Sequence, residues 1–398
     1  MAHAATLLIL IFAASTARAQ EPPAGTTPAF VVQSDNGDNR LQIGGFVHVD
    51  GRFAVQDRDD LVTDTFLVRR LRTVTQGRLA RHMEFYLNVD LAGNAVNVRD
   101  AYFDTRFSDA FRVRVGKFKA PFSYDRLILV SSLLFVERGL TTQIASDRDV
   151  GIQVLGDLHG AKVSYAAAVT NGTVDGGSVD SDPNESKDVT GRVVLKPWVG
   201  TSSSLSGFGV AAAASTGTAG GALPWFQTAA RQVFFAYQNA TGVGRRTRWS
   251  PQAFFYRGPF GAYAELVRSR GHVQREGTEA RIDHDGWEIT SSWVLTGEAA
   301  GERNVRPAVN FDPPSGHWGA VQVAARYHQL HVGPEAVANG FAAPGASVTA
   351  RAFTVGLNWY LNPFVKWNLN LERTSFPDGP APRRPAETAI LLRAHFGF

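Results

Sequence analysis

The chain has 398 residues, no cysteine and a formal net charge of +4, from 40 Lys and Arg residues against 36 Asp and Glu residues. The absence of cysteine excludes disulfide bonds, thiolate metal sites and cysteine nucleophiles. The basic excess is small and no run of five or more basic residues occurs, so the composition does not predict a nucleic-acid partner.

The first residues have the pattern of a secretory signal peptide. Residues 4–14 form a short apolar core, and Ala17-Arg18-Ala19 matches the A-x-A cleavage pattern. The core is shorter than the ~20 residues that a membrane-spanning helix needs. We therefore predict a signal peptide over residues 1–19, Sec-type export, and a flexible lead-in over residues 20–40.

From residue 41 onward, apolar and polar residues alternate in many segments. In residues 83–91, and from Val365 to Leu371 within residues 364–376, apolar side chains occupy every second position, and the positions between them are mostly charged or amide side chains. The same alternation runs through residues 390–398 to the last residue, Phe398. A period of two predicts β-strands with one apolar face.

Sixteen strands are predicted in chain order. They cover residues 41–55, 65–79, 82–92, 96–107, 110–118, 149–157, 161–171, 187–197, 203–216, 245–257, 259–270, 284–297, 316–331, 348–361, 364–377 and 386–398. Tight links alternate with longer loops near residues 56–64, 93–96, 119–148, 172–186, 217–244, 271–281, 332–347 and 377–385. Residues 229–238 also have a strand pattern. Because a single-chain bacterial barrel should have an even number of strands, we assign these residues to the loop that contains them.

The pattern fits a membrane barrel better than a soluble sandwich, which can also alternate apolar and polar residues. The strands are long and numerous, short and long connections alternate, and aromatic residues gather near the short turns. We predict an all-β fold, a 16-stranded antiparallel transmembrane β-barrel over residues 41–398. Two features fit poorly, namely a long link at residues 298–315 where a short turn is expected, and Pro251 inside a strand.

Five segments carry a resemblance to a known family. They are VGKFKAPFSYDRLILVSSLLFVERGL from Val115, RDVGIQVLG from Arg148, LQIGGFVHVDG at 41–51, DAYFDTRF at 100–107 and GPFGAYAEL at 258–266. Together they resemble the phosphate-selective porin O and P family. The resemblance implies a 16-stranded outer-membrane pore, usually a trimer, whose characterised members pass phosphate or polyphosphate. A terminal aromatic such as Phe398 also resembles the signal by which the outer-membrane insertion machinery recognises its substrates.

The long connection over residues 119–148 is the candidate constriction. Its middle, LILVSSLLFV at residues 127–136, would form an exposed apolar patch on an external loop. Folding this third extracellular loop into the barrel would bury it, as the family resemblance also implies. The alternative is an external loop that covers a trimer interface.

Charged residues on and near this loop are the candidate anion-binding site, because rings of Arg or Lys in a pore lower the barrier for anions. Arginine suits phosphate, since its planar fork donates two hydrogen bonds at once. We expect Asp90 to face the site and to orient a lysine, while other wall arginines pair with wall carboxylates. The predicted site comprises Lys117, Lys119, Arg126, Arg138, Arg148, Arg112, Arg114 and Asp90.

The predicted function is passive diffusion of small anions, with phosphate or polyphosphate favoured, across the outer membrane of a Gram-negative bacterium. The alternative is a general porin, or a sugar- or carboxylate-specific one, because Tyr86, Tyr102 and Tyr263 are also predicted to face inward. Neither a G-x-S-x-G nor an HExxH motif occurs, so we predict no enzyme, cofactor or metal site. The predicted partners are outer-membrane lipid, a small anionic solute, the insertion machinery and two further copies in a homotrimer.

Overall fold

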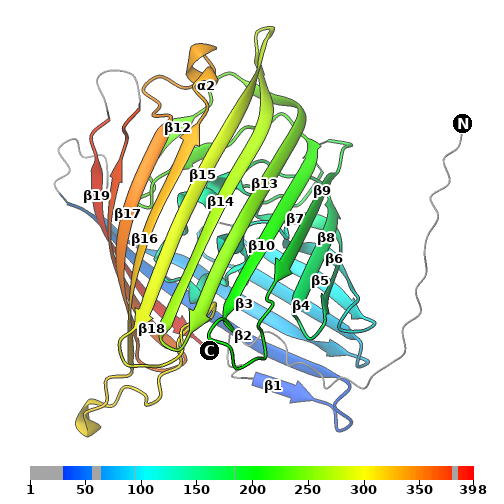
Figure 1. Cartoon of the computed structure of the whole chain (residues 1–398), viewed down its shortest axis with the longest axis vertical. Coiled ribbons are helices and arrows are strands. Elements are labelled where there is room, and N and C mark those ends of the chain that lie inside the picture. The colour runs from blue at the N-terminus through cyan, green and yellow to red at the C-terminus, as the bar shows by residue number, and fades with distance from the viewer. Residues whose placement is uncertain (1–29, 56–63, 94, 183, 379–383) are drawn as a thin grey trace, which may run out of the picture.

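The computed structural model describes residues 30–55, 64–93, 95–182, 184–378 and 384–398. Sixteen strands form one closed antiparallel barrel, as predicted (Figure 1). The strands are β2 (Arg40–Ala54), β3 (Thr65–Leu79), β4 (Met83–Asp90), β5 (Asn97–Arg106), β6 (Arg112–Lys119), β7 (Arg148–Leu158), β8 (Val163–Thr170), β9 (Asp188–Leu195), β10 (Phe208–Thr218), β13 (Thr241–Arg257), β14 (Phe260–Arg275), β15 (Thr278–Val294), β16 (Ala320–Val332), β17 (Thr349–Tyr360), β18 (Val365–Ser375) and β19 (Glu387–Gly397). The predicted signal peptide lies outside the described residues and stays a prediction.

The two faces of the wall differ as the alternation requires. On the outer face, large apolar side chains such as Val115, Ile152 and Ile289 remain 49%, 54% and 56% exposed. On the inner face, polar side chains such as Asn368 and Asn370 are buried. A continuous band of exposed apolar side chains is unfavourable in water, and it fits a wall that faces lipid.

The last residue of the chain closes the barrel. β19 pairs with β2, and the backbone N–H groups of Phe398 and Gly45 each donate to the other residue's carbonyl at 3.0 Å. A Cβ atom on Gly45 would lie 2.7 Å from the Phe398 ring, so only glycine leaves room for that ring. The apolar pattern therefore continues to the terminus because Phe398 is part of the wall.

The barrel has a turn end and a loop end, which lie at the bottom and top of Figure 1. The C-terminus lies at the turn end, and α2 (Glu335–Ala338) at the loop end. The predicted loop over residues 271–281 is wrong, because β14 and β15 continue through it to a two-residue turn. Glu276 and Gly277 form that turn with left-handed φ angles of 49° and 83°, which hairpin turns of this length require. The extended hairpin is polar at its tip, which is why the sequence there has the pattern of a loop.

The remaining irregular segments lie at the barrel ends or inside loops. Residues 30–33 form β1 (Phe30–Gln33), which pairs with the start of β2, so this part of the expected flexible lead-in is a strand. Residues 229–238 contribute β12 (Val233–Ala236), which pairs only with β11 (Trp225–Gln227) and stays outside the barrel sheet, consistent with the loop assignment. Pro251 lies in β13 opposite Ala212, and the ladder with β14 is interrupted beside it.

The helices are short. They are α1 (Tyr124–Leu127), η1 (Val130–Ser132), η2 (Leu140–Ile144), η3 (Pro313–Ser315) and α2. In the described part of the chain, no helix is long and apolar enough to cross a membrane. The segment at residues 295–319 is long, as its sequence indicated, and it contains η3 at the turn end.

Candidate functional site

The connection between β6 and β7, residues 120–147, contains α1, η1 and η2 and is hydrogen-bonded to polar side chains of the wall. Glu265 on β14 accepts from the Ser123 hydroxyl and the Tyr124 backbone N–H, both at 2.9 Å. This carboxylate satisfies N–H and O–H donors at the start of α1, where the backbone has no intrahelical acceptor. Glu265 therefore fixes the first turn of the connection to the wall.

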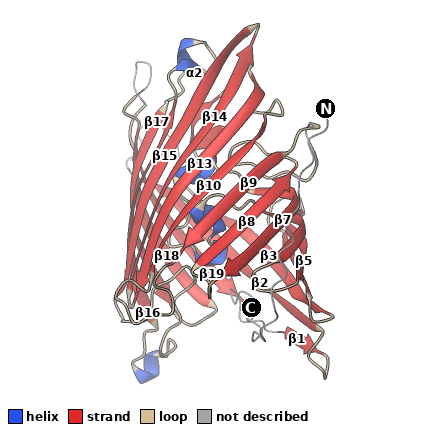
Figure 2. Cartoon of the chain, turned by 45° about the vertical axis from the view of Figure 1, so that its right-hand side comes forward, coloured by secondary structure: helices blue, strands red, loops and turns tan. Residues whose placement is uncertain are grey.

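The same connection is bonded to other strands on the far side of the barrel. The Val136 backbone N–H donates to Asn370 Oδ1 at 2.7 Å, and the Leu140 backbone N–H donates to His328 Nδ1 at 2.9 Å. Lys366 donates to the backbone carbonyls at positions 131 and 133. Figure 2 shows the helices of this connection behind the front strands, consistent with contacts to the polar faces of β14, β16 and β18.

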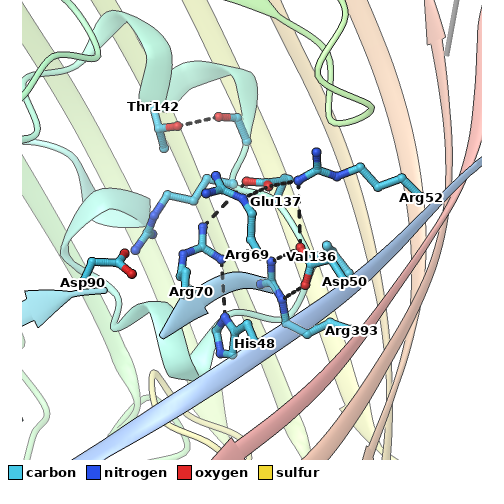
Figure 3. Close-up of polar contacts among 12 residues, drawn as sticks. His48, Asp50, Arg52, Arg69, Arg70, Asp90, Val136, Glu137, Thr142 and Arg393 are labelled. Carbon is cyan, nitrogen blue, oxygen red and sulfur yellow. Dashed lines mark hydrogen bonds and ion pairs between the residues drawn. The ribbon is translucent and has the colours of Figure 1, made fainter. Parts of the chain in front are cut away.

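Glu137 is the main ionic anchor of this connection (Figure 3). Its carboxylate accepts from Arg52 at 3.2 Å and from Arg69 at 2.9 Å, and a nitrogen of Arg70 lies at 3.8 Å. Burial alone would raise the pKa of Glu137, but the charges of the surrounding arginines hold this pKa well below its usual value. Glu137 does not pair with its neighbour Arg138, which instead bonds to Asp125 at 3.0 Å within the connection.

Two cavities are lined in part by this connection. The loop-end cavity has a volume of about 640 Å³, and the turn-end cavity has a volume of about 390 Å³. Arg72, Val130 and Arg148 line both cavities. We call these three residues the waist, because they stand where the two cavities meet.

Carboxylates hold both waist arginines in place. Arg72 Nε donates to Asp90 at 2.8 Å. Arg148 donates to both oxygens of Asp100, at 3.0 and 3.1 Å, and to Asp147 at 3.0 Å. The two-point contact with Asp100 fixes the plane of the Arg148 guanidinium group.

The loop-end cavity is rich in arginine. Its described lining includes Arg69, Arg70, Arg72, Arg99, Arg126, Arg138, Arg148 and Arg231, with the carboxylates Asp90, Glu137, Asp147 and Asp175. Arginines thus outnumber carboxylates by eight to four in this lining, which makes the cavity attractive to anions.

The sequence model of the family described as "Phosphate-selective porin O and P" matches residues 41–386. The chain belongs to this family. No curated protein matches the sequence of this porin.

Solved structures share its fold at low sequence identity. An anion-selective porin from Comamonas acidovorans has a TM-score of 0.57 at 12% identity, covering 90% of this chain and 100% of that one. The outer membrane channel DcaP of Acinetobacter baumannii has a TM-score of 0.56 at 10% identity, covering 92% and 99%. In-vitro folded OmpT of Vibrio cholerae in its trimer form has a TM-score of 0.55 at 8% identity, covering 90% and 99%. These similarities establish that the chain has the same β-barrel fold as these outer-membrane proteins.

Seven of the eight predicted site residues line the cavities of this porin. Asp90, Arg126 and Arg138 line the loop-end cavity, Arg112, Arg114 and Lys119 line the turn-end cavity, and Arg148 lines both. The eighth, Lys117, lines neither of them. Its ammonium group donates to Asp180 and to the Val98 carbonyl. We therefore leave Lys117 out of the anion path.

The partners of the lining residues also differ from expectation in part. Asp90 bonds to Arg72 rather than orienting a lysine. Arg114 makes a two-point contact with Asp104, with both distances at 2.7 Å. Lys119 donates to the backbone carbonyls of residues 127 and 128, at 3.2 and 2.9 Å.

Two cavity arginines were missed because they lie in β-bulges. In the pairing of β2 with β3, His48 is opposite Arg70 and Val49 is opposite Val68, so Arg69 is an extra residue. In the pairing of β4 with β5, Asn88 is opposite Asp100 and Val89 is opposite Val98, so residue 99 is extra. A bulge changes which face the following residues occupy.

The bulges turn additional cations into the loop-end cavity. Val68 points outward while Arg70 is buried inside, which a regular strand forbids for residues two apart. Arg69 then reaches Glu137, and Arg99 reaches Asp147 at 3.0 Å. The sequence contained one sign of the first bulge. Val68 and Arg70 are two residues apart and would share a face of a regular strand, but one is apolar and the other is charged.

Proposed function

We propose that this porin is a passive outer-membrane diffusion channel for small anions, with phosphate or polyphosphate as the favoured solutes, through a lumen lined by Arg and Lys. The observation that carries the proposal is the meeting of two cation-rich cavities at Arg72 and Arg148. Membership of the phosphate-selective porin O and P family and the shared fold with the anion-selective porin from Comamonas acidovorans support anion transport.

The proposed path uses the cations in sequence. The arginine excess of the loop-end cavity raises the local concentration of anions. At the waist, the guanidinium groups of Arg72 and Arg148 replace part of the anion's hydration shell. Carboxylates already accept some of the N–H donors of each guanidinium group, so an anion binds weakly enough to leave. Beyond the waist, Lys119 and Arg192 have no carboxylate partner in the described chain, and they offer the next uncompensated charges.

We further propose that residues 119–148 form the constriction loop, with Glu137 holding its middle to β2 and β3. An open barrel of 16 strands leaves a wide aqueous channel. The wall contacts of Glu265, Asn370 and His328 support a fixed loop that narrows this channel. The alternative, a cover over a trimer interface, is harder to reconcile with side chains on the inner face as partners.

The proposed setting is an outer membrane with the turn end facing the periplasm. The exposed apolar outer face would contact lipid, and the terminal Phe398 would be recognised by the insertion machinery after Sec-type export and removal of residues 1–19. A homotrimer is proposed by analogy with the trimer form of OmpT.

Single-channel recording in chloride, with phosphate added as a blocker, tests this function. We expect phosphate to reduce the chloride current in a saturable manner, because it competes for the forks at the waist. A channel that discriminates weakly between ions and is not blocked by phosphate would instead be a general porin.

A further inference from the structure

The turn-end cavity differs from the loop-end cavity in the chemistry of its lining. The constriction loop presents Pro121, Leu127, Leu129 and Val130 to it, and the wall adds Val74. The part of this lining that the loop supplies is therefore largely apolar, with Ser131 as its polar member. A path for inorganic anions alone gains nothing from such a surface.

The wall of this cavity also carries aromatic rings. Tyr86 and Tyr102 lie on neighbouring strands with ring centroids 5.4 Å apart and an interplanar angle of 20°. The guanidinium carbon of Arg114 lies 3.9 Å from the Tyr102 ring centroid. Within the described chain, neither tyrosine hydroxyl has a protein hydrogen-bond partner, so both can donate to a solute in the cavity.

Two cations of this cavity have no carboxylate partner among the described residues. Lys119 donates only to backbone carbonyls, and Arg192 donates to the amide oxygen of Gln252 at 3.1 and 2.9 Å. Arg112, by contrast, is paired with Asp157 at 3.2 Å. The cavity thus combines an apolar side, stacked phenol rings and positive charge that the protein does not neutralise.

We propose that the turn-end cavity is a binding site for carboxylates with a flat apolar body, such as aromatic carboxylates. The apolar body would lie between the loop side chains and the tyrosines, and the carboxylate would face Lys119 and Arg192. The volume of about 390 Å³ is in the range of small-molecule sites, ~300–1,000 Å³. The inference rests on the proposed function, because the solute must first pass the cationic waist.

Block of the chloride current by three probes tests the inference in the full-length channel. Benzoate and acetate carry the same charge and differ only in the apolar body, and inorganic phosphate has no apolar body. We expect the half-blocking concentration of benzoate to be at least fivefold lower than that of acetate, and lower than that of phosphate. Equal block by benzoate and acetate would overturn the inference while leaving an anion-selective channel intact.

Two test variants and one control variant locate the effect. Leu129→Ser makes the apolar side polar, and we expect it to bring the benzoate and acetate values within about twofold of each other. Leu134→Ser is the matched control, since Leu134 belongs to the same loop but lines a separate small cavity, and it should keep the wild-type ratio. Tyr86→Ser tests the aromatic part of the wall independently and should also reduce the ratio. A wild-type ratio in both Leu129→Ser and Tyr86→Ser would overturn the site assignment.

A failure of the underlying function has a different readout. If the wild-type channel shows no preference for chloride over potassium, the proposed function fails, whatever the block by benzoate. If it prefers chloride but does not distinguish benzoate from acetate, only the carboxylate site fails.

Discussion

Reversing one charge at the waist should change the ion selectivity of the channel. Arg148→Glu changes the charge there by two units, next to Arg72 and between the two cavities. In addition, it leaves Asp100 and Asp147 without one of their cationic partners. The waist then presents a carboxylate in place of one of the two guanidinium groups of the wild type.

The size of the effect follows from Coulomb's law. One unit charge ~4 Å from an ion contributes about 1 kcal/mol in water. Two units therefore raise the anion's energy at the waist by about 2 kcal/mol and lower that of a cation by a similar amount. Salt screening reduces both numbers, and about 1.4 kcal/mol corresponds to a factor of ten. We expect the chloride-to-potassium permeability ratio to fall at least tenfold.

The assay is the zero-current potential across a planar bilayer in a potassium chloride gradient. Lys117→Glu is the matched control, because it makes the same charge change while its side chain lies outside both cavities, and we expect less than a twofold shift. The double variant Asp100→Asn/Arg148→Gln removes the ion pair without changing the net charge, so folding of the site is tested separately. Equal shifts in Arg148→Glu and Lys117→Glu would refute the placement of the waist.

Three further predictions concern the supports of the site. Deleting the bulge residue Arg99 should leave a regular ladder and a folded barrel, which still shows heat-dependent gel mobility but has weaker anion selectivity. Deleting Ala101 should instead shift the register and prevent assembly. Gly45→Val should lower the yield of folded barrel, measured by its heat-dependent gel mobility, because a Cβ atom there collides with the Arg72 backbone carbonyl and with the Phe398 ring. Glu137→Gln should leave buried arginines facing a neutral amide, at a cost of ~3–5 kcal/mol to loop anchoring, and increase open-channel noise. The pKa of Glu137 is depressed in the folded protein, so its contribution to loop anchoring is fully present above the usual carboxyl pKa. This contribution is lost only as the pH falls through the lowered pKa. Wild-type recordings between pH 7 and pH 5 should therefore show no increase in noise from this contact.

The sequence was sufficient for the barrel because lipid on one side and water on the other impose a strict period of two. The strand β3 was predicted over the residues that form it, 65–79, and the sixteen strands pair in chain order. The extended hairpin around Glu276 was missed because its tip lies beyond the apolar band, where alternation no longer marks a strand.

The candidate site was predictable only where the pattern stayed regular. Arg112 and Arg114 line a cavity, as their alternation on a regular strand predicted. Arg69 and Arg99 could not be placed, because a single extra residue in a strand reverses inside and outside without any change in composition. The partners of Glu137 were equally out of reach, since Arg52 on β2 and Arg69 on β3 precede it by 85 and 68 residues.

The most direct test of the account is the zero-current potential of the wild-type channel in a tenfold potassium chloride gradient. A lumen whose two cavities are lined by more cations than carboxylates predicts a potential with the sign of the chloride equilibrium potential. A potential of zero, or one with the sign of the potassium equilibrium potential, would contradict the account.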